Sequence, residues 1–367
     1  MSQDLEAVYH VRSDARSIEA RARAIAVEQS VEMPVEAIED GYVLSSIVGR
    51  VVGIEEKEAR TFEVRIALAA ETVGQDPGQL INMLFGNTSI HDDVVLRDAT
   101  IPGELAKAFG GPRHGLAGLR RKVGASERAL TCSALKPQGL RPKELAGLAE
   151  KFARGGIDYV KDDHGLADQA YSPFAARVAA IAPALRAVGP ATGRAARYVP
   201  SLSGDLETMR RQVGVAREAG IDTVMAAPMI AGLSNFHTLV RENPDLAFFA
   251  HPALAGAARI DPAFLFGKLF RLFGADALVF PNHGGRFGYS PETCRRIARA
   301  ALENRAGMLP SVPVPAGGMS LERVPEMLDF YGTDTMLLIG GALLASGERL
   351  VEATAEFVAA VEGHGHG

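Results

Sequence analysis

The chain has 367 residues, of which 47% are hydrophobic and 23% charged, so it is long enough for two or three domains around a substantial core. Its formal net charge of -5 leaves no basic excess, which argues against nucleic acid and against an anionic membrane as partners. Only two cysteines, no amino-terminal signal pattern and no apolar run of about 18 residues predict a protein of the reducing cytoplasm that spans no membrane.

Residues 1–125 mix helices and strands without a fixed repeat. Apolar residues at helical spacing predict helices over Ala15–Glu28 and Pro77–Leu84. Alternating polarity predicts strands over Gly49–Glu55 and Thr61–Leu68. The mixture is typical of an α+β domain in which an antiparallel sheet carries helices on one face.

From Ala129 onward, short apolar strands alternate with amphipathic helices. The predicted strands are Leu130–Leu135, Ile157–Val160, Tyr198–Leu202, Thr223–Ala227, Ala247–Ala250, Ala277–Phe280, Ser311–Val314 and Met336–Ile339. The predicted helices include Pro142–Arg154, Pro173–Ala182, Leu206–Ala219, Pro262–Phe273, Pro291–Asn304 and Leu321–Phe330. Eight such repeats within 126–367 fit a closed (β/α)8 barrel, whose usual size is about 250 residues. A doubly wound open sheet is the alternative, but no Gly-x-Gly-x-x-Gly motif follows the first strand.

Catalytic residues of such barrels lie where strands end, and the second predicted strand ends in a charged run. Lys161, Asp162, Asp163 and His164 directly follow Ile157–Val160. Because burying unpaired charge is costly, we expect these groups outside the core, either in a solvated loop or in a site. Lys161 as an ammonium cannot bind a metal, whereas its CO2 adduct, a carbamate, would be an oxygen ligand. A salt-bridged surface cluster is the alternative.

Other strand ends carry a lysine and two glycine pairs. Lys136 ends the first strand, where a partly desolvated amine suits proton transfer, although a solvated lysine is the simpler alternative. Gly317 and Gly318 follow the seventh strand, and Gly340 and Gly341 follow the eighth. Backbone N–H groups at these two positions commonly bind a phosphate in barrels, so we favour phosphate binding over plain tight turns.

Several segments together resemble the large subunit of RuBisCO. They are Val27-Glu28, Phe85–Asn87, Phe109–Leu116, Ala134–Pro137, Gly155–Asp163, Ala316–Gly318 and Ile339–Gly341. They follow the family's order along nearly the whole chain. The resemblance implies an α/β chain, with an α+β (ferredoxin-like) domain in residues 1–125 followed by a (β/α)8 TIM barrel in residues 126–367.

The resemblance also implies roles for individual residues. Lys136 is expected to transfer the proton during enolisation, Lys161 to be carbamylated by CO2, and Asp163 to bind Mg2+. Glu28 and Asn87 are expected to reach the active site of a neighbouring subunit, which implies a homodimer with active sites at the subunit interface. One phosphate is expected at Gly317, Gly318, Gly340 and Gly341.

The departures from the family pattern indicate a non-carboxylating, RuBisCO-like protein. His164 stands where carboxylases have a second acidic metal ligand, although Mg2+ prefers oxygen ligands. Other family ligands are also replaced, by Gln138, Pro252, Val279 and Ala316. His251 and Arg286 remain as expected substrate contacts, and one phosphate site survives. His164 is kept as a candidate metal ligand.

These features predict an isomerase of a small phosphorylated sugar that works through an enediolate. The expected reaction converts 5-methylthioribulose 1-phosphate to 1-methylthioxylulose 5-phosphate in methylthioadenosine and methionine salvage. The expected cofactors are Mg2+ and CO2, the latter as the lysine carbamate. Alternatives are a 2,3-diketo-5-methylthiopentyl 1-phosphate enolase, a decarboxylase or transcarboxylase of another sugar-acid phosphate, and a non-catalytic regulatory protein.

Overall fold

The computed structural model of the protein describes residues 4–305 and 307–364. The chain forms two compact units, Met1–Gly110 with Leu254–Leu265, and Gly111–Ala253 with Phe266–Gly367. The division falls before the predicted boundary at residue 125, because helix α4 (Gly115–Val123) packs Leu116 and Leu119 into the core of the second unit.

The first unit contains a four-stranded antiparallel sheet in the order β2-β3-β1-β4. Its strands are β1 (Asp4–Arg12), β2 (Arg50–Glu58), β3 (Thr61–Ala69) and β4 (Val94–Thr100). Its helices are α1 (Ile18–Glu28), α2 (Pro77–Phe85) and α3 (Gly103–Phe109), with short helical turns at Val35–Ala37, Val43–Ile47, Ala70–Thr72, Asn87–Ile90 and Ala255–Ala257. This strand order and the β-α-β-β-α-β sequence of elements confirm the ferredoxin-like domain.

Strand β1 lies in the middle of this sheet although the sequence-based prediction did not include it. Leu5, Ala7, Tyr9 and Val11 are buried, and the residues between them are partly exposed. This alternation is the signal of a strand with one face against the core, so β1 could have been found from its sequence.

The second unit contains eight parallel strands in two runs, β12-β5-β6-β7 and β8-β9-β10-β11. The strands are β5 (Leu130–Leu135), β6 (Tyr159–Asp162), β7 (Arg197–Val199), β8 (Thr223–Ala226), β9 (Ala247–Ala250), β10 (Ala277–Pro281), β11 (Val312–Ala316) and β12 (Met336–Leu338). A bridge between Ser201 and Met225 joins the runs at β7 and β8, and Thr335 donates to Pro313 O at 2.9 Å where β11 meets β12. The predicted barrel is confirmed.

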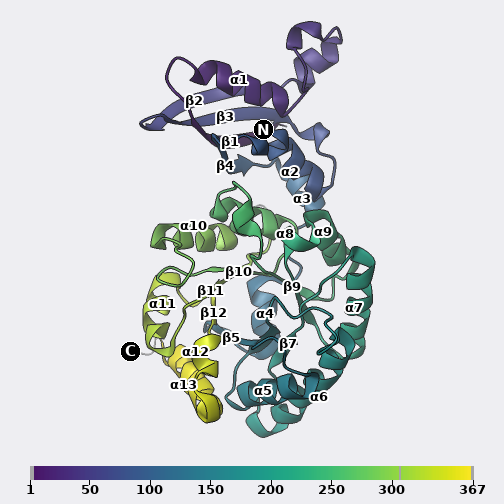
Figure 1. Ribbon diagram of the computed structural model, residues 1–367, viewed down its shortest axis with the longest axis vertical. Helices are drawn as coiled ribbons and strands as arrows, with labels where there is room; N and C mark the ends of the chain where they lie inside the picture. Colours follow the sequence, from purple (N-terminus) through teal and green to yellow (C-terminus); the bar gives the residue numbers. More distant parts are fainter. Residues whose placement is uncertain (1–3, 306, 365–367) are drawn as a thin grey trace. The chain divides into compact units, whose positions relative to one another are not determined.

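Helices surround the barrel strands (Figure 1). They are α5 (Pro142–Arg154), α6 (Phe174–Thr192), α7 (Leu206–Glu218), α8 (Pro228–Ala231), α9 (Leu233–Glu242), α10 (Pro291–Leu302), α11 (Val324–Tyr331), α12 (Gly341–Leu344) and α13 (Leu350–Gly363). Shorter turns lie at Leu321–Arg323 and Gly347–Arg349, and the helix predicted over Pro262–Phe273 is a π-helix at Ala263–Phe270. No helix within the described residues is long and apolar enough to cross a membrane.

Alternate residues of the strands fill the interior of the barrel. The buried core includes Cys132 of β5, Tyr159 of β6 and Phe249 of β9. Because side chains alternate along a strand, residues two or four positions further on face the same interior, nearer the carboxyl ends. This alternation brings Lys136, Lys161 and His251 to one end of the barrel.

Candidate active site

Strand β6 carries two charges that are buried, contrary to the sequence-based expectation that they lie outside the core. The strand begins and ends two residues later than predicted, so Lys161 and Asp162 belong to it and are 3% and 0% exposed. Their burial is possible because both have partners. Asp162 accepts hydrogen bonds from Arg177 Nε (3.0 Å), Tyr198 OH (2.7 Å) and the Ser201 backbone N–H (3.0 Å). A charge with such partners avoids the cost of an unpaired one.

The Lys161 side chain lies on the same face of β6 as Tyr159, which faces the interior of the barrel. Its Nζ donates a hydrogen bond to the backbone oxygen of Asp162 at 2.7 Å. Burial lowers the pKa of Lys161, and the positive charge of Lys136 acts in the same direction, while Cys132 and Asp163 oppose the shift. A lowered pKa means that the neutral amine forms more readily in Lys161 than in an exposed lysine. The neutral amine is the form that reacts as a nucleophile or base.

Lys136, Asp163 and His164 form a polar cluster where β5 and β6 end. Lys136 Nζ lies 2.8 Å from Asp163 Oδ1, and His164 Nδ1 lies 3.4 Å from the same oxygen. Burial raises the pKa of Asp163, but hydrogen bonds with His164 and Lys136 and the charge of Lys161 outweigh it and hold the pKa below its usual range. The carboxylate therefore stays ionised, and the Lys136 side chain, 32% exposed, is open to a small molecule.

His251 joins this cluster through its ring. It stacks on His164 with ring centroids 4.4 Å apart and planes 10° apart. Burial, with help from the charges of Lys161 and His164, lowers the pKa of His251 to about 2. His251 Nδ1 accepts a hydrogen bond from the Ala253 backbone N–H at 3.2 Å, so in the neutral ring the proton is on Nε2. His251 is therefore a neutral N–H donor at physiological pH.

The glycine pairs follow strands β11 and β12. Gly317 and Gly318 have φ values of 83° and 80°, the left-handed region that favours glycine. A Cβ on Gly318 would lie only 2.7 Å from the Cα of Gly285, so the loops after β10 and β11 pack backbone against backbone. A Cβ on Gly340 would lie 3.9 Å from Lys136 Cε, which places the loop after β12 beside the Lys136 amine.

Arg286 lies on the loop after β10 but does not join the polar cluster in the described part of the chain. Its guanidinium stacks on Phe287, 4.8 Å from the ring centroid. The Phe287 ring in turn covers Gly317, where an added Cβ would lie 3.0 Å from it. Arg286 is thus near the glycine loop, and its predicted contact with substrate stays a prediction.

Glu28 and Asn87 meet within the first unit. Asn87 Nδ2 donates to Glu28 Oε1 at 2.9 Å and to Glu32 Oε1 at 2.8 Å. These residues line a cavity of about 160 Å³. Glu32 was not predicted from the sequence, where nothing marks it. Its φ of 52°, a backbone conformation uncommon outside glycine, is visible only in the structure.

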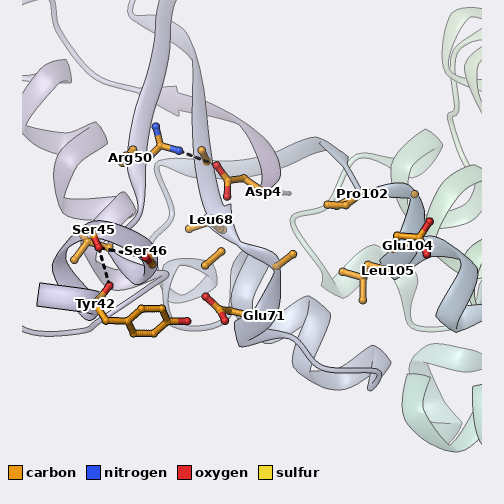
Figure 2. A pocket seen from close by; sticks show the side chains of 15 residues that line it. Asp4, Tyr42, Ser45, Ser46, Arg50, Leu68, Glu71, Pro102, Glu104 and Leu105 are labelled. Atoms are coloured by element: carbon orange, nitrogen blue, oxygen red, sulfur yellow. Dashed lines mark hydrogen bonds and ion pairs between the residues drawn. The ribbon is translucent and has the colours of Figure 1, made fainter. Parts of the chain in front are cut away.

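A larger groove of about 970 Å³ also belongs to the first unit (Figure 2). Its lining includes Tyr42, Ser45, Ser46 and the exposed ion pair of Arg50 with Asp4, whose atoms are 2.7 Å apart. None of the predicted site residues lines this groove, and the Arg50–Asp4 ion pair is of the exposed kind that contributes little to stability. We assign no catalytic role to it.

The unmodified side chains do not fit Mg2+. Among the described residues, no three or more His, Cys, Asp or Glu side chains are placed to hold a metal ion. The carboxylate of Asp162 is held by Arg177 and Tyr198, and Asp163 Oδ1 is bonded to Lys136. Mg2+ requires near-octahedral oxygen coordination, and one free carboxylate oxygen with a neighbouring imidazole does not provide it.

Comparison with known proteins identifies the class. Residues 115–348 match the family described as the ribulose bisphosphate carboxylase large chain, catalytic domain. The chain therefore belongs to the RuBisCO large-chain family, as its fold and barrel-end site indicate. Within the family it groups with the RuBisCO-like proteins. The crystal structure of the Rubisco-like protein from Rhodopseudomonas palustris superimposes with a TM-score of 0.93 and 52% identity, covering 100% of this chain and 99% of that one.

Named relatives of the chain include two enzymes. The 5-methylthioribulose-1-phosphate isomerase of Rhodospirillum rubrum is 60% identical over 364 residues, 99% of this chain and 97% of that protein. The 2,3-diketo-5-methylthiopentyl-1-phosphate enolase of Geobacillus thermodenitrificans is 32% identical over 86% of this chain and 81% of that protein. The ribulose bisphosphate carboxylase-like protein 1 of Rhodopseudomonas palustris is 53% identical, covering 100% and 99%.

Proposed function

We propose that the protein isomerises 5-methylthioribulose 1-phosphate to 1-methylthioxylulose 5-phosphate in methionine salvage. The observation that carries the proposal is the accessible Lys136 amine, 2.8 Å from an ionised Asp163 and beside the glycine loop after β12. The 60% identity to an isomerase of that name supports the substrate. A cytoplasmic location is proposed with it, since both cysteines are buried and free.

The site residues would divide the reaction between them. Lys136, in its neutral form, removes a proton from the carbon next to the substrate carbonyl, and the C–H electron pair forms the enediolate. The Nε2–H of neutral His251 stabilises the charge that develops on oxygen. Return of the proton to the former carbonyl carbon moves the carbonyl one position along the chain, so two successive enolisations carry it from C2 to C4 of the substrate, which is C2 of the product, and no co-reactant is consumed. Asp163 holds Lys136 in place between the two transfers.

The single phosphate of the substrate is proposed to bind at the glycine loops after β11 and β12. The left-handed backbone at Gly317 and Gly318 and the open space at Gly341 would leave N–H groups accessible there. Because Gly340 lies beside Lys136 Cε, a phosphate bound there would leave the sugar carbons within reach of the amine. Arg286, on the neighbouring loop, is proposed as a further contact.

Mg2+ and a carbamate on Lys161 are proposed as cofactors. The lowered pKa of Lys161 favours the neutral amine, which is the form that adds CO2. A carbamate would supply the hard oxygens that the unmodified side chains lack, next to Asp163 and His164. A bound Mg2+ would stabilise negative charge on a substrate oxygen.

A homodimer is proposed in which Glu28 and Asn87 complete the active site of the partner. Asn87 is already oriented by two carboxylates, which leaves its amide oxygen free to accept a hydrogen bond from a sugar hydroxyl. A preoriented amide of this kind suits binding better than a mobile one.

The enolase reaction is the second candidate because enolases are among the relatives at 32% identity. Purified protein with Mg2+ and bicarbonate would be incubated in D2O with each substrate in turn and followed by proton NMR. We expect conversion of 5-methylthioribulose 1-phosphate, with deuterium at the exchanged carbon. Enolisation of the 2,3-diketo substrate with no conversion of the ribulose phosphate would replace the isomerase by the enolase. Inertness toward both would refute the proposal.

A further inference from the structure

A buried polar network lies behind the active site, between strands β6 and β7 and helix α6. Arg177 of α6 and Tyr198 of β7 both bond the carboxylate of Asp162, as described above. Arg177 is 0% exposed and Tyr198 is 4% exposed. Arg177 Nη1 also donates to the backbone oxygen of Ser172 at 2.7 Å, which anchors the guanidinium to the loop that follows β6. Two separate elements therefore hold one carboxylate.

Asp162 lies between the two residues whose positions matter most for the site. Side chains alternate along a strand, so Lys161 and Asp163 face the interior while Asp162 faces the helices. Lys161 Nζ is bonded to the backbone oxygen of Asp162, and Asp163 follows directly. Donors that fix the Asp162 side chain from behind therefore fix the peptide units that carry Lys161 and Asp163.

Stability alone does not account for this network. A buried ion pair can generally be replaced by well-packed apolar side chains at little or no loss of stability. Among the described residues, the buried Arg177 Nη2 group has no acceptor within hydrogen-bond distance. If the network served stability alone, each of its buried donors would be expected to have a hydrogen-bond acceptor. A role in holding catalytic groups explains the arrangement better.

We propose that Arg177 and Tyr198 are positioning residues that act through Asp162 to hold Lys161 and Asp163, and through Asp163 the Lys136 amine. The proposal rests on the proposed isomerase function and deepens it. Neither residue touches substrate. Small displacements of catalytic groups are costly, since a misplacement of about 1 Å can lower a rate about 100-fold.

Tyr198→Phe is the sharpest test because it removes one hydrogen bond and keeps the ring. Its matched control is Tyr159→Phe, since Tyr159 is also buried in the barrel and its hydroxyl donates to Leu119 O of helix α4 at 2.8 Å. We expect kcat to fall roughly 10- to 100-fold in Tyr198→Phe, with KM changed less than about twofold. Tyr159→Phe should lose a similar amount of Tm and keep its kcat.

Arg177 provides a second test with a conservative rescue. Arg177→Met removes the charge that compensates Asp162, and Arg177→Lys restores a charge at the same place. We expect kcat to follow the order wild type, Arg177→Lys, Arg177→Met. Should Arg177→Met not fold, the comparison of Tyr198→Phe with Tyr159→Phe decides the matter alone.

A measurement without substrate separates this proposal from the proposed function. Amine labelling of Lys136, followed by peptide mass spectrometry, reports how firmly Asp163 holds the ammonium group. We expect labelling to be several-fold faster in Tyr198→Phe than in wild type and unchanged in Tyr159→Phe. If both variants match each other in kcat and in labelling, the positioning role is refuted. Faster labelling in Tyr198→Phe with an inactive wild type would uphold positioning and refute the isomerase.

Discussion

Lys136 Nζ donates a hydrogen bond to Asp163 Oδ1 at 2.8 Å, and this contact joins the ends of strands β5 and β6. The two residues are 27 positions apart in the chain. A general acid–base lysine needs a fixed position and a way to change its charge, and an ionised carboxylate at this distance supplies the first.

Replacing Lys136 should abolish proton transfer and leave the fold intact. Lys136→Met is expected to slow deuterium exchange at the substrate by roughly 100-fold or more, the usual contribution of a general base. Because the side chain is 32% exposed, Tm should change little. Lys143→Met, in the exposed first turn of α5, is the control and should exchange like wild type. Normal exchange in Lys136→Met would refute the role of Lys136.

Gly340→Ala should weaken binding of the phosphorylated substrate. Its φ of -107° lies outside the left-handed region and the new methyl would make only an ordinary contact, 3.9 Å from Lys136 Cε, so alanine fits the fold but occupies space proposed for the phosphate. We expect KM to rise about tenfold, with weaker competition by inorganic phosphate. Gly214→Ala in α7, where an added Cβ meets nothing within 4 Å, should leave both unchanged. An equal effect of the two substitutions would argue against phosphate binding at Gly340.

Two inactive variants should restore activity when combined. If Glu28 serves the partner's active site, a heterodimer of Glu28→Ala and Lys136→Met chains contains one intact site. Random pairing after co-expression should then recover roughly a quarter of wild-type activity. If each active site were built from one chain only, co-expression of the two variants would recover no activity. Size-exclusion chromatography of the same samples checks that dimers form.

His251 should make the protein less stable in mild acid. Its pKa is about 2 in the folded protein and about 6.5 in an unfolded chain, so below pH 6.5 the unfolded state binds more protons. The contribution of His251 to the free energy of unfolding is therefore fully present above pH 6.5. It decreases as the pH falls, by at most about 2 kcal/mol between pH 6.5 and 5. Urea unfolding across this range should show the slope in wild type and in His91→Gln, but a smaller slope in His251→Gln. Equal slopes in all three would contradict the neutral state of the half-buried His251.

Lys161 should be the site of CO2 addition. In 13C-bicarbonate with Mg2+, wild type is expected to show a carbamate carbon signal in its NMR spectrum, and Lys161→Met should lose it. Lys151→Met, on helix α5, should retain the signal. Activity should fall when Mg2+ is chelated and CO2 is removed, and recover when both return. A signal that persists in Lys161→Met would place the carbamate elsewhere.

Much of the fold followed from the order of residues. Alternation of apolar strands with amphipathic helices predicted the barrel, and β5, β9 and α5 begin and end where predicted. Hydrophobic periodicity works for these elements because each buries one face or both against neighbours close in the chain. The strand ends also marked Lys136, Asp163 and His164 as candidate site residues, and these residues meet in the structure because parallel strands end at one edge.

Tertiary structure alone decided how the charges of β6 are accommodated. The sequence places Lys161 and Asp162 after an apolar run, and the cost of unpaired charge predicts their exposure. Arg177 and Tyr198 remove that cost, but they lie 15 and 36 residues beyond Asp162, on a helix and on the next strand. Similarly, Glu32 could be recognised as part of a polar cluster only from its hydrogen bond with Asn87, 55 residues away. Local patterns determine elements and their ends, whereas the burial of a charge depends on partners that only the folded chain brings into contact.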